Sequence, residues 1–343
     1  MLNKKRYRFT LVSVAPVYIG SGKKYFKTEY FFRDGKFYFP DMFALYKVIQ
    51  QKGNRELNDF EDFLAQAGYY KNNRETLGDF INKHDICIDG IPIREVDAVD
   101  LNVKRYEVHE FMKNAYGASY VPGSSLKGAL RTMIVSTLNL DDASNSKYIK
   151  KLFSNIRVSD SNEIPGDQLV IVPKNDLNKE KDEPNQLPIL RESIKPMTKI
   201  TFEITCSAND FDEQDNAIQL MDQLVNISIK HYEEMKITFY NKFKRHINLM
   251  QKNAKNWGVL YLGGGTGWVH KTLFKNKKVL EEIQNRSARG KMRMKDVGTM
   301  KLTKYKVTQK NSSFLKQRVT MGDIAYFEMG RCIFKMEEID NER

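Results

Sequence analysis

The amino-acid sequence predicts a mixed α+β fold, in which strands alternate with amphipathic helices along one chain. Residues 7–14 alternate large and polar side chains with the period of two that a half-buried strand requires. Residues 29–39 form two such runs around the dipeptide Asp34-Gly35, which is typical of a tight β-hairpin turn. Residues 126–137 instead carry apolar side chains at every third or fourth position, which indicates a helix with one buried face.

Helices are expected between the hairpin and the strands that follow it. Asp41 is the expected N-cap of a first helix, and Gly68 can end a second one. Strand patterns resume at Ile86 and again over residues 99–108. Residues of about 41–84 are therefore interpreted as a helical insertion between strands.

The rest of the chain continues the alternation of strands and helices. Strand patterns are found at residues 156–159, 169–172, 199–206 and 324–336. Helical spacing extends from about residue 214 to 246. Residues 175–188 are polar, charged and proline-bearing, which is typical of a solvated loop, and residues 271–310 are strongly basic.

The charge of the chain favours a polyanionic partner. Lysine and arginine number 56 against 43 aspartate and glutamate residues, which gives a formal net charge of +13. Nucleic acid is the first candidate for such a partner, and a membrane surface is the second. A lysine-rich proteome is the alternative explanation. Hydrophobic residues make up 41% of the chain, so we expect a folded, soluble protein.

Cysteine and histidine are too scattered to indicate a metal site or a disulfide framework. The three cysteines are far apart and form no CxxC pair, and no two histidines are one helical turn apart. The N-terminal apolar run is too short for a signal peptide, and no segment reaches the length of a membrane span. We expect a cytoplasmic protein with no membrane partner, no cofactor and no metal.

A turn of residues 120–125 leads into the predicted helix. Ser124 or Ser125 is expected to cap that helix, whose first N–H groups lie at the positive end of its dipole and suit a phosphate. Lys127 and Arg131 are four residues apart and share a face away from the apolar stripe, so both are predicted to bind a phosphodiester backbone. The alternative is an ordinary amphipathic helix with solvated cations. The segment does not match GxxxxGK[ST], so ATP binding is not expected.

Two glycine-rich segments are further candidates for RNA binding. The first is a predicted loop after the first strand, with Gly20, Ser21, Gly22, Lys23 and Lys24 as its candidate residues. Glycines let a backbone approach a ligand closely, and lysines supply charge for phosphates. A common tight turn with exposed lysines is the alternative.

The second segment combines glycines with an indole, an imidazole and a cation. Its candidate residues are Gly263, Gly264, Gly265, Trp268, His270 and Lys271. Aromatic side chains beside cations stack bases and bind phosphates in single-stranded nucleic-acid sites. The alternative is a flexible turn with Trp268 in the core.

Three segments resemble the signature blocks of the RAMP (repeat-associated mysterious protein) superfamily. They are PVYIGSG after the first strand, YVPGSSLKGALRT at the start of a helix, and YLGGGTGWVHKTL further on. The serine-lysine-glycine-arginine block is the most specific of the three. The segment EYFF…GKFYFPD and the stretch RESIKP also resemble the fifth subunit of the Csm complex of type III-A CRISPR interference.

The resemblance implies an RRM-like, ferredoxin-type RAMP core with helical insertions and a helix-rich C-terminal half. Residues 1–205 would form the core, and residues 206–343 a helical and glycine-loop region that completes the fold. It also implies a subunit that binds the guide RNA (crRNA), caps its 3′ side, and takes part in 3′-end maturation and antiviral defence. The implied partners are adjacent RAMP backbone subunits, small helical subunits of the complex, and host nucleases that trim the guide.

Catalysis is not expected, because the residues that RAMP nucleases use are not found at the matching positions. RAMP subunits that cut target RNA resemble one another in an aspartate shortly after the first glycine motif, where this chain has residues 23–29 without aspartate. Guide-processing RAMP endonucleases rely on a histidine with a tyrosine or lysine, and no histidine here is paired by its spacing. The competing interpretations are a RAMP-type endoribonuclease acting on guide precursor or target RNA, and a nucleotide-binding protein with glycine-rich loops.

Overall fold

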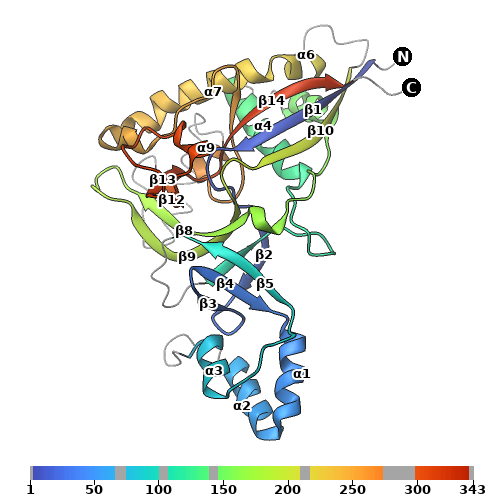
Figure 1. Cartoon of the computed structure of the whole chain (residues 1–343). Helices are drawn as coiled ribbons and strands as arrows, with labels where there is room; N and C mark the ends of the chain where they lie inside the picture. The colour runs from blue at the N-terminus through green and yellow to red at the C-terminus, as the bar shows by residue number, and fades with distance from the viewer. Residues whose placement is uncertain are drawn as a thin grey trace.

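Two β-sheets organise the chain, with helices at both ends of the molecule (Figure 1). The computed structural model describes residues 3–65, 75–99, 107–138, 146–208, 217–272 and 298–339. The predicted mixed α+β fold is confirmed, because strands and helices alternate throughout these residues.

The first sheet is built around its central strand, β1. Its strands, in order across the sheet, are β11 (Gly258–Tyr261), β14 (Arg331–Ile339), β1 (Asn3–Ser13), β10 (Lys199–Ala208) and β7 (Ile156–Val158). All neighbouring strands run antiparallel. Tyr7, Phe9 and Leu11 alternate along β1 and are buried, and the Phe9 ring stacks on Phe334 at 4.8 Å between centroids. The alternation in the sequence thus marks the face of β1 that packs in the core.

Helices pack against the first sheet. They are α4 (Gly123–Thr137), α5 (Ser146–Ser154), α6 (Ala217–Asp222) and α7 (Leu224–Thr238). The predicted apolar stripe of α4 is confirmed, since Leu126, Leu130 and Ile134 are buried. The helical stretch expected from about residue 214 to 246 is confirmed within the described residues, but in pieces: α6 and α7 are followed by a kinked 3₁₀ segment η4 (Tyr240–Leu249), with non-helical dihedral angles at Phe243.

The second sheet contains most of the remaining strands. Its order is β2 (Gly20–Tyr25), β6 (Glu107–Phe111), β9 (Asn185–Ile194), β8 (Leu169–Leu177), β5 (Ile93–Ala98), β4 (Lys36–Pro40) and β3 (Phe31–Arg33). β12 (Met300–Lys306) pairs with β8, and β13 (Ile324–Glu328) pairs with β12. Three short helical turns complete the described elements: η3 (Gly166–Gln168), η5 (Trp268–His270) and α9 (Gln309–Ser312).

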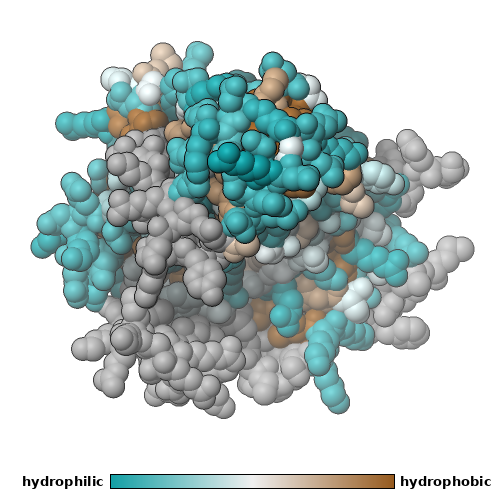
Figure 2. All heavy atoms as spheres, turned by 90° about the horizontal axis from the view of Figure 1, so that it is seen from below, coloured by the Kyte–Doolittle hydropathy of each residue, from teal (hydrophilic) through white to brown (hydrophobic). Residues whose placement is uncertain are grey.

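Three helices form a separate lobe beyond β3 and β4. They are α1 (Met42–Lys52), α2 (Asn54–Ala65) and α3 (Leu77–Lys83), and they share a core of their own. The predicted cap is confirmed, because the Asp41 carboxylate accepts from the N–H groups of Phe43 and Ala44 at 2.9 Å each. Seen from this end, the coloured surface of the molecule is mostly hydrophilic (Figure 2).

Some local expectations are corrected by long-range pairing. The segment from Gly20 to Gly22 is not a loop but the start of β2, which bulges between Gly20 and Lys24 where it pairs with β6. The polar stretch 175–188 is largely the tip of the β8–β9 hairpin, whose register extends to Asp176 and Asn185. Ile86 lies outside any strand. The strand expected over 99–108 is described only from residue 107, since residues 100–106 lie outside the described part.

The predicted hairpin is confirmed, and its turn explains the dipeptide. Asp34 and Gly35 both have positive φ, at 50° and 76°, between β3 and β4. Such a turn matches the twist of antiparallel strands, and glycine adopts it without steric cost. No helix in the described part of the chain is long and apolar enough to cross a membrane.

We predict opposite effects on stability for two glycines of α4. A Cβ on Gly123 would lie 2.3 Å from the Ser159 carbonyl oxygen, so Gly123→Ala should lower the free energy of unfolding by about 1–3 kcal/mol. Gly128 has open space around it, so Gly128→Ala should raise that free energy by up to about 1 kcal/mol through helix propensity. Chemical denaturation of both variants tests this, and equal effects would show that α4 does not approach β7 closely.

Candidate nucleic-acid interface

An open groove of about 420 Å³ runs between α4 and the glycine-rich segment that follows β11. One wall is a helix face of small side chains, the other is the glycine-rich backbone, and cations stand at its edge. The lining residues are Ile19, Gly20, Ser124, Ser125, Gly128, Ala129, Arg131, Thr132, Tyr261, Gly263, Gly264, Thr266, His270 and Lys271. The groove thus brings together parts of all three blocks that the sequence singled out.

More than half of the predicted binding residues line this groove. They are Gly20, Ser124, Ser125, Arg131, Gly263, Gly264, His270 and Lys271. Backbone hydrogen bonds hold the first and third blocks together, because the Gly264 N–H donates to the Tyr18 carbonyl at 2.7 Å. The Gly330 N–H donates to the Pro16 carbonyl at 2.8 Å, and the Leu262 N–H donates to the Gly330 carbonyl at 2.8 Å.

Close backbone approach accounts for the glycines of the third block. Gly263 has a φ of 94°, and a Cβ there would lie 2.1 Å from the Tyr18 carbonyl oxygen. Any other residue would push the loop away from β2 and change the width of the groove. Gly265 has a different role, since a Cβ on it would meet the Met329 side chain at 2.2 Å and it does not line the groove.

Arg131 is a cation of the helix wall that has no ion pair with any residue the structure describes. Its side chain is exposed at the groove. One turn earlier, Gly128 leaves open space, and Ser124 and Ser125 put hydroxyls on the same wall. A narrow wall of this kind lets a polyanion approach the guanidinium without displacing another side chain.

The cap of α4 differs from the prediction. Neither Ser124 nor Ser125 caps the helix. Pro122 is the N-cap residue, and its side chain forms no capping hydrogen bond. The Gly123 N–H instead donates to the Asp160 carboxylate at 2.7 Å. An anionic side chain therefore already occupies the positive end of the helix dipole, so the phosphate site predicted there is taken by the protein itself.

Lys127 is also placed differently from the prediction. Its ammonium donates to the Ile156 carbonyl at 2.6 Å, and it does not line the groove with Arg131. β7 is the last strand of the first sheet, so its carbonyl groups on that side have no strand partner. Burial, and then the nearby Arg157, lower the pKa of Lys127. Lys127 and Arg131 are four residues apart on α4, as the sequence indicates. The long Lys127 side chain nevertheless bends to the Ile156 carbonyl and does not share a binding face with Arg131.

The remaining residues of the first block lie on β2, outside the groove. The Ser21 hydroxyl donates to Glu110 at 2.9 Å, and Lys24 pairs with Glu107 at 2.9 Å. Lys23 stands over the Tyr25 ring, 4.5 Å from its centroid. Gly22, with a φ of 93°, lies within the same bulged strand.

Trp268 does not reach the groove either. Its indole is half-buried and packs against the second hydrophobic cluster, around Tyr240 and Phe243. It begins the short turn η5, which carries His270 back to the groove. The interpretation of Trp268 as a core residue therefore fits the structure better than base stacking.

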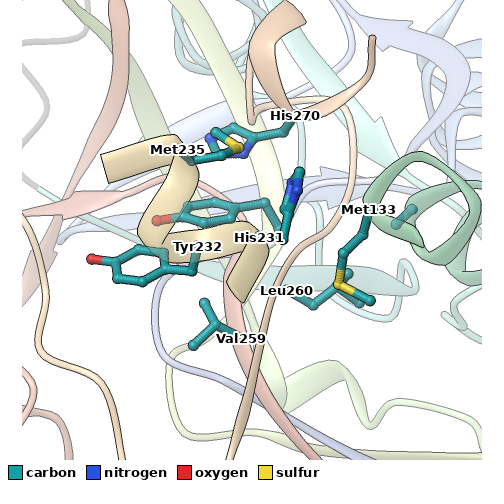
Figure 3. A pocket seen from close by; sticks show the side chains of 9 residues that line it. Met133, His231, Tyr232, Met235, Val259, Leu260 and His270 are labelled. Atoms are coloured by element: carbon teal, nitrogen blue, oxygen red, sulfur yellow. The ribbon is translucent and has the colours of Figure 1, made fainter. Parts of the chain in front are cut away.

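His270 forms the floor of the groove and the roof of a small inner pocket of about 20 Å³ (Figure 3). Its ring stacks on Tyr261 with centroids 3.8 Å apart, and its Nε2 lies 3.1 Å from the Tyr240 hydroxyl. Burial, followed by the nearby His231 and Arg331, holds the pKa of His270 well below its usual value. The imidazole is therefore neutral at pH 7, and the pocket beneath it has room for about one water molecule.

A buried ion pair supports this floor from below. Arg331 is fully buried and pairs with Glu328, which is 2% exposed. The Tyr261 hydroxyl donates to the same carboxylate at 2.7 Å, and the Gln251 N–H donates to it at 2.7 Å. Tyr261 is thus fixed between Glu328 and the ring of His270.

Several groove residues were missed from the sequence. Gly128, Ala129 and Thr132 belong to the specific block and continue its small-residue face. Gly128 and Ala129 follow Ser125 by three and four residues, and Thr132 follows them by four and three, so this helical spacing could have identified all three. Tyr261 and Thr266 flank the glycines, but nothing in the sequence shows that Tyr261 lies on the floor. The basic residues 273–297 lie outside the described part.

The described residues contain neither a cluster of metal ligands nor a disulfide bond. No group of three or more His, Cys, Asp or Glu side chains there is placed to hold a metal ion. Cys87, Cys206 and Cys332 are free. Burial raises the pKa of Cys206 to about 12, so its thiol stays protonated.

The comparisons with known proteins agree on one family. A family model described as the RAMP superfamily matches residues 10–270. The chain is 32% identical to the "CRISPR system Cms protein Csm5" of Streptococcus thermophilus, over 98% of each chain. It is 29% identical to the protein of the same name from Enterococcus italicus, over 82% of this chain and 83% of that protein.

Two solved structures share the fold. One is a chain of "Cryo-EM structure of Csm-crRNA-target RNA ternary complex in type III-A CRISPR-Cas system", with a TM-score of 0.60 and 18% identity over 97% of this chain and all of that one. The other is "Crystal structure of T.onnurineus Csm5", with a TM-score of 0.55 and 16% identity over 94% of this chain and 99% of that one. At these identities the likeness concerns the fold alone.

We predict that Glu328→Gln will destabilise the protein strongly. Removing one partner of a buried ion pair leaves Arg331 without a counter-charge and should lower the free energy of unfolding by about 3–5 kcal/mol. Glu203→Gln is the control, because its pair with Arg6 is solvent-exposed and contributes under about 1 kcal/mol. Similar losses in both variants on urea denaturation would contradict the supporting role of the pair.

Proposed function

The chain belongs to the RAMP superfamily and, within it, to the family of Csm5 proteins; from that premise we propose that it binds guide RNA as a subunit of the type III-A CRISPR complex. The observation that carries the proposal is the convergence of three distant sequence blocks on one groove. A surface assembled from residues 19–271 is a tertiary feature, and its walls offer backbone, hydroxyls and cations. These groups suit a sugar-phosphate chain rather than base edges.

Single-stranded RNA is the polyanion that fits the groove. Its floor is the ring of His270, and its edge carries Arg131 and Lys271. Partial burial and the nearby Arg191 lower the pKa of Lys271. A bound phosphate would offset this repulsion between Lys271 and Arg191, so an anion is expected to bind there favourably.

The first sheet supports an RRM-like, ferredoxin-type core. β1 and β7 run parallel to each other on either side of β10, and α4 lies between them in the chain. β10 and β14 both run antiparallel to β1, with α6 and α7 between them in the chain. This order is that of the split β-α-β motif, with β11 added at the edge. In this proposal residues 1–205 form the RAMP core, and residues 206–343 complete it.

The resemblance assigns the subunit a position at the end of its complex. We propose that the chain caps the 3′ side of the guide, next to RAMP backbone subunits and small helical subunits. In that position it would take part in 3′-end maturation, with host nucleases trimming the RNA, and in antiviral defence in the cytoplasm. The relative in the ternary complex is described with crRNA and target RNA, which supports RNA as the ligand.

Binding rather than cleavage is the proposed activity. The positions after the first glycine motif hold Lys23 and Lys24, which are engaged with Tyr25 and Glu107. Lysine binds phosphate but is a poor base at neutral pH. The groove histidine, His270, is stacked and hydrogen-bonded in place and has no described carboxylate partner. An endoribonuclease remains the alternative for this superfamily.

We predict that Arg131→Gln weakens RNA binding, whereas Lys127→Met does not. Loss of one charge-assisted phosphate contact should lower the affinity about tenfold and reduce the log–log salt slope by about 0.7. Lys127 bonds Ile156 instead, so Lys127→Met should lower stability by about 1 kcal/mol and leave the affinity nearly unchanged. Filter binding to single-stranded RNA over a range of salt tests both, and the reverse pattern would refute the groove.

We predict that the purified protein does not cleave guide precursor or target RNA, with or without Mg²⁺. RNA hydrolysis needs a group that activates the 2′-hydroxyl or water and a second that protonates the leaving oxygen. Asp41, His109 and His270 are the side chains to replace as controls, although Asp41 already caps α1. Cleavage that persists through purification and is lost in one of these variants would establish the endoribonuclease.

A further inference from the structure

Three basic side chains form a row across the second sheet. In the register of the strands, Lys24 on β2 is opposite His109 on β6, and His109 is opposite Arg191 on β9. Residues directly opposite each other point to the same face of a sheet. With strands about 4.8 Å apart, the row extends across about 10 Å.

The acids that follow in the sequence point to the other face. Glu110 comes after His109, and Glu192 comes after Arg191. Glu192 is 1% exposed and pairs with Lys113 at 2.9 Å and with Arg94, so it is already neutralised. The sheet thus separates its charges, with paired carboxylates on one face and the basic row on the other.

Little compensates the row on its own face. The Glu107 carboxylate lies 2.9 Å from the Lys24 ammonium and 3.5 Å from His109 Nε2, so one acid is shared between two members of the row. Arg191 has no ion pair within the described residues; its guanidinium stacks on Tyr18, 5.0 Å from the ring centroid. The lowered pKa of His109 leaves an imidazole between the charges of Lys24 and Arg191, and Glu107 offsets only the charge of Lys24 by an ion pair.

The row begins at the groove. A Cβ on Gly265 would lie 3.0 Å from Arg191 Nη1, and the Gly264 N–H donates to the carbonyl of Tyr18, on whose ring Arg191 stacks. Lys24 is 45% exposed and the His109 side chain 22%, so solvent reaches both, although His109 Nε2 itself is buried beside Glu107. A chain that leaves the groove past the glycines therefore meets Arg191, then His109, then Lys24.

We propose that Lys24, His109 and Arg191 bind successive phosphates of the RNA where it leaves the groove. The proposal rests on the proposed function and extends the contact with single-stranded RNA onto the second sheet. An RNA backbone matches a row of cations that are spaced along a line and offer no base-reading groups.

The row also makes binding depend on pH. Desolvation, Lys24 and Arg191 lower the pKa of His109, and Glu107 raises it less. Tyr18 packs edge-on against the imidazole, with centroids 6.4 Å apart, and adds no charge at neutral pH. A phosphate beside His109 raises the pKa in the complex above that in the free protein. The affinity therefore rises as pH falls through the pKa of the complex and levels off below that of the free protein.

The experiment compares Lys24→Gln and His109→Gln with Lys36→Gln in the full-length protein. Lys36 is a matched control, because it pairs with Glu95 at 3.0 Å and is 43% exposed, close to the values for Lys24. Binding of single-stranded RNA is measured over a range of salt, and between about pH 8 and about pH 5. Thermal melting of each variant confirms that it is folded.

We expect Lys24→Gln to lower the affinity severalfold and to reduce the salt slope by about 0.7, and Lys36→Gln to change neither. His109→Gln should remove most of the rise in affinity at low pH. Equal effects of Lys24→Gln and Lys36→Gln, or an unchanged pH profile in His109→Gln, would overturn the proposal. If Lys24→Gln abolishes binding of an acidic peptide and leaves RNA binding intact, the row belongs to a protein partner instead.

The outcome is separable from that of the proposed function. If Arg131→Gln weakens RNA binding and neither Lys24→Gln nor His109→Gln does, RNA binding in the groove is supported and RNA binding by the row is refuted. If the unmodified protein binds no RNA in any condition, the proposed function itself fails. In a length series of RNA, only the longer oligonucleotides should respond to Lys24→Gln, since the shortest ones fill the groove alone.

Discussion

The buried ion pair of Arg331 and Glu328 is the constraint on which the rest of the structure depends. The two residues are three positions apart, at the end of β13 in the second sheet and the start of β14 in the first. Burying both charges costs less when hydrogen bonds satisfy their other polar atoms, as they do here for all but Arg331 Nε. Tyr261 and the backbone of Gln251 donate to the carboxylate, and Asn253 accepts from the guanidinium. One pair thus joins both sheets, β11 and the segment before it.

The shape of the groove depends on this contact between the two sheets. Gly330, at the turn between the paired residues, has a φ of 80°, and a Cβ there would lie 2.4 Å from the Leu262 carbonyl oxygen. Its own N–H and carbonyl then bond Pro16 and Leu262, which places the first and third blocks side by side. Because Tyr261 is held by Glu328, the ring of His270 has a fixed surface to stack on. The floor and one wall of the groove are therefore set from beneath, before any ligand is present.

Sequence reasoning succeeded where the determinants are local and failed where they are not. The turn at Asp34 and the cap at Asp41 depend on neighbours within three residues, and both are as predicted. The cap of α4 comes from Asp160, and the partner of Lys127 is a carbonyl at the edge of another strand, so no local pattern could reveal either. Blocks that resemble family signatures gave the groove residues, but only the fold shows which side chains face it.

Charge excess alone does not define the binding surface of this chain. Many of its exposed lysines stand beside carboxylates, as Lys36 does with Glu95, and such pairs leave little field for a ligand. A cation that forms no ion pair with a described carboxylate can bind a polyanion without replacing an existing pair, whereas Lys24 must exchange Glu107 for the phosphate. Arg131 forms no ion pair with a described residue at the groove, and Arg191 forms none at the sheet, where Glu192 is turned to the opposite face and only the more distant Asp176 favours its charge. The alternation of a strand, rather than the composition of the chain, thus determines where the net charge can act.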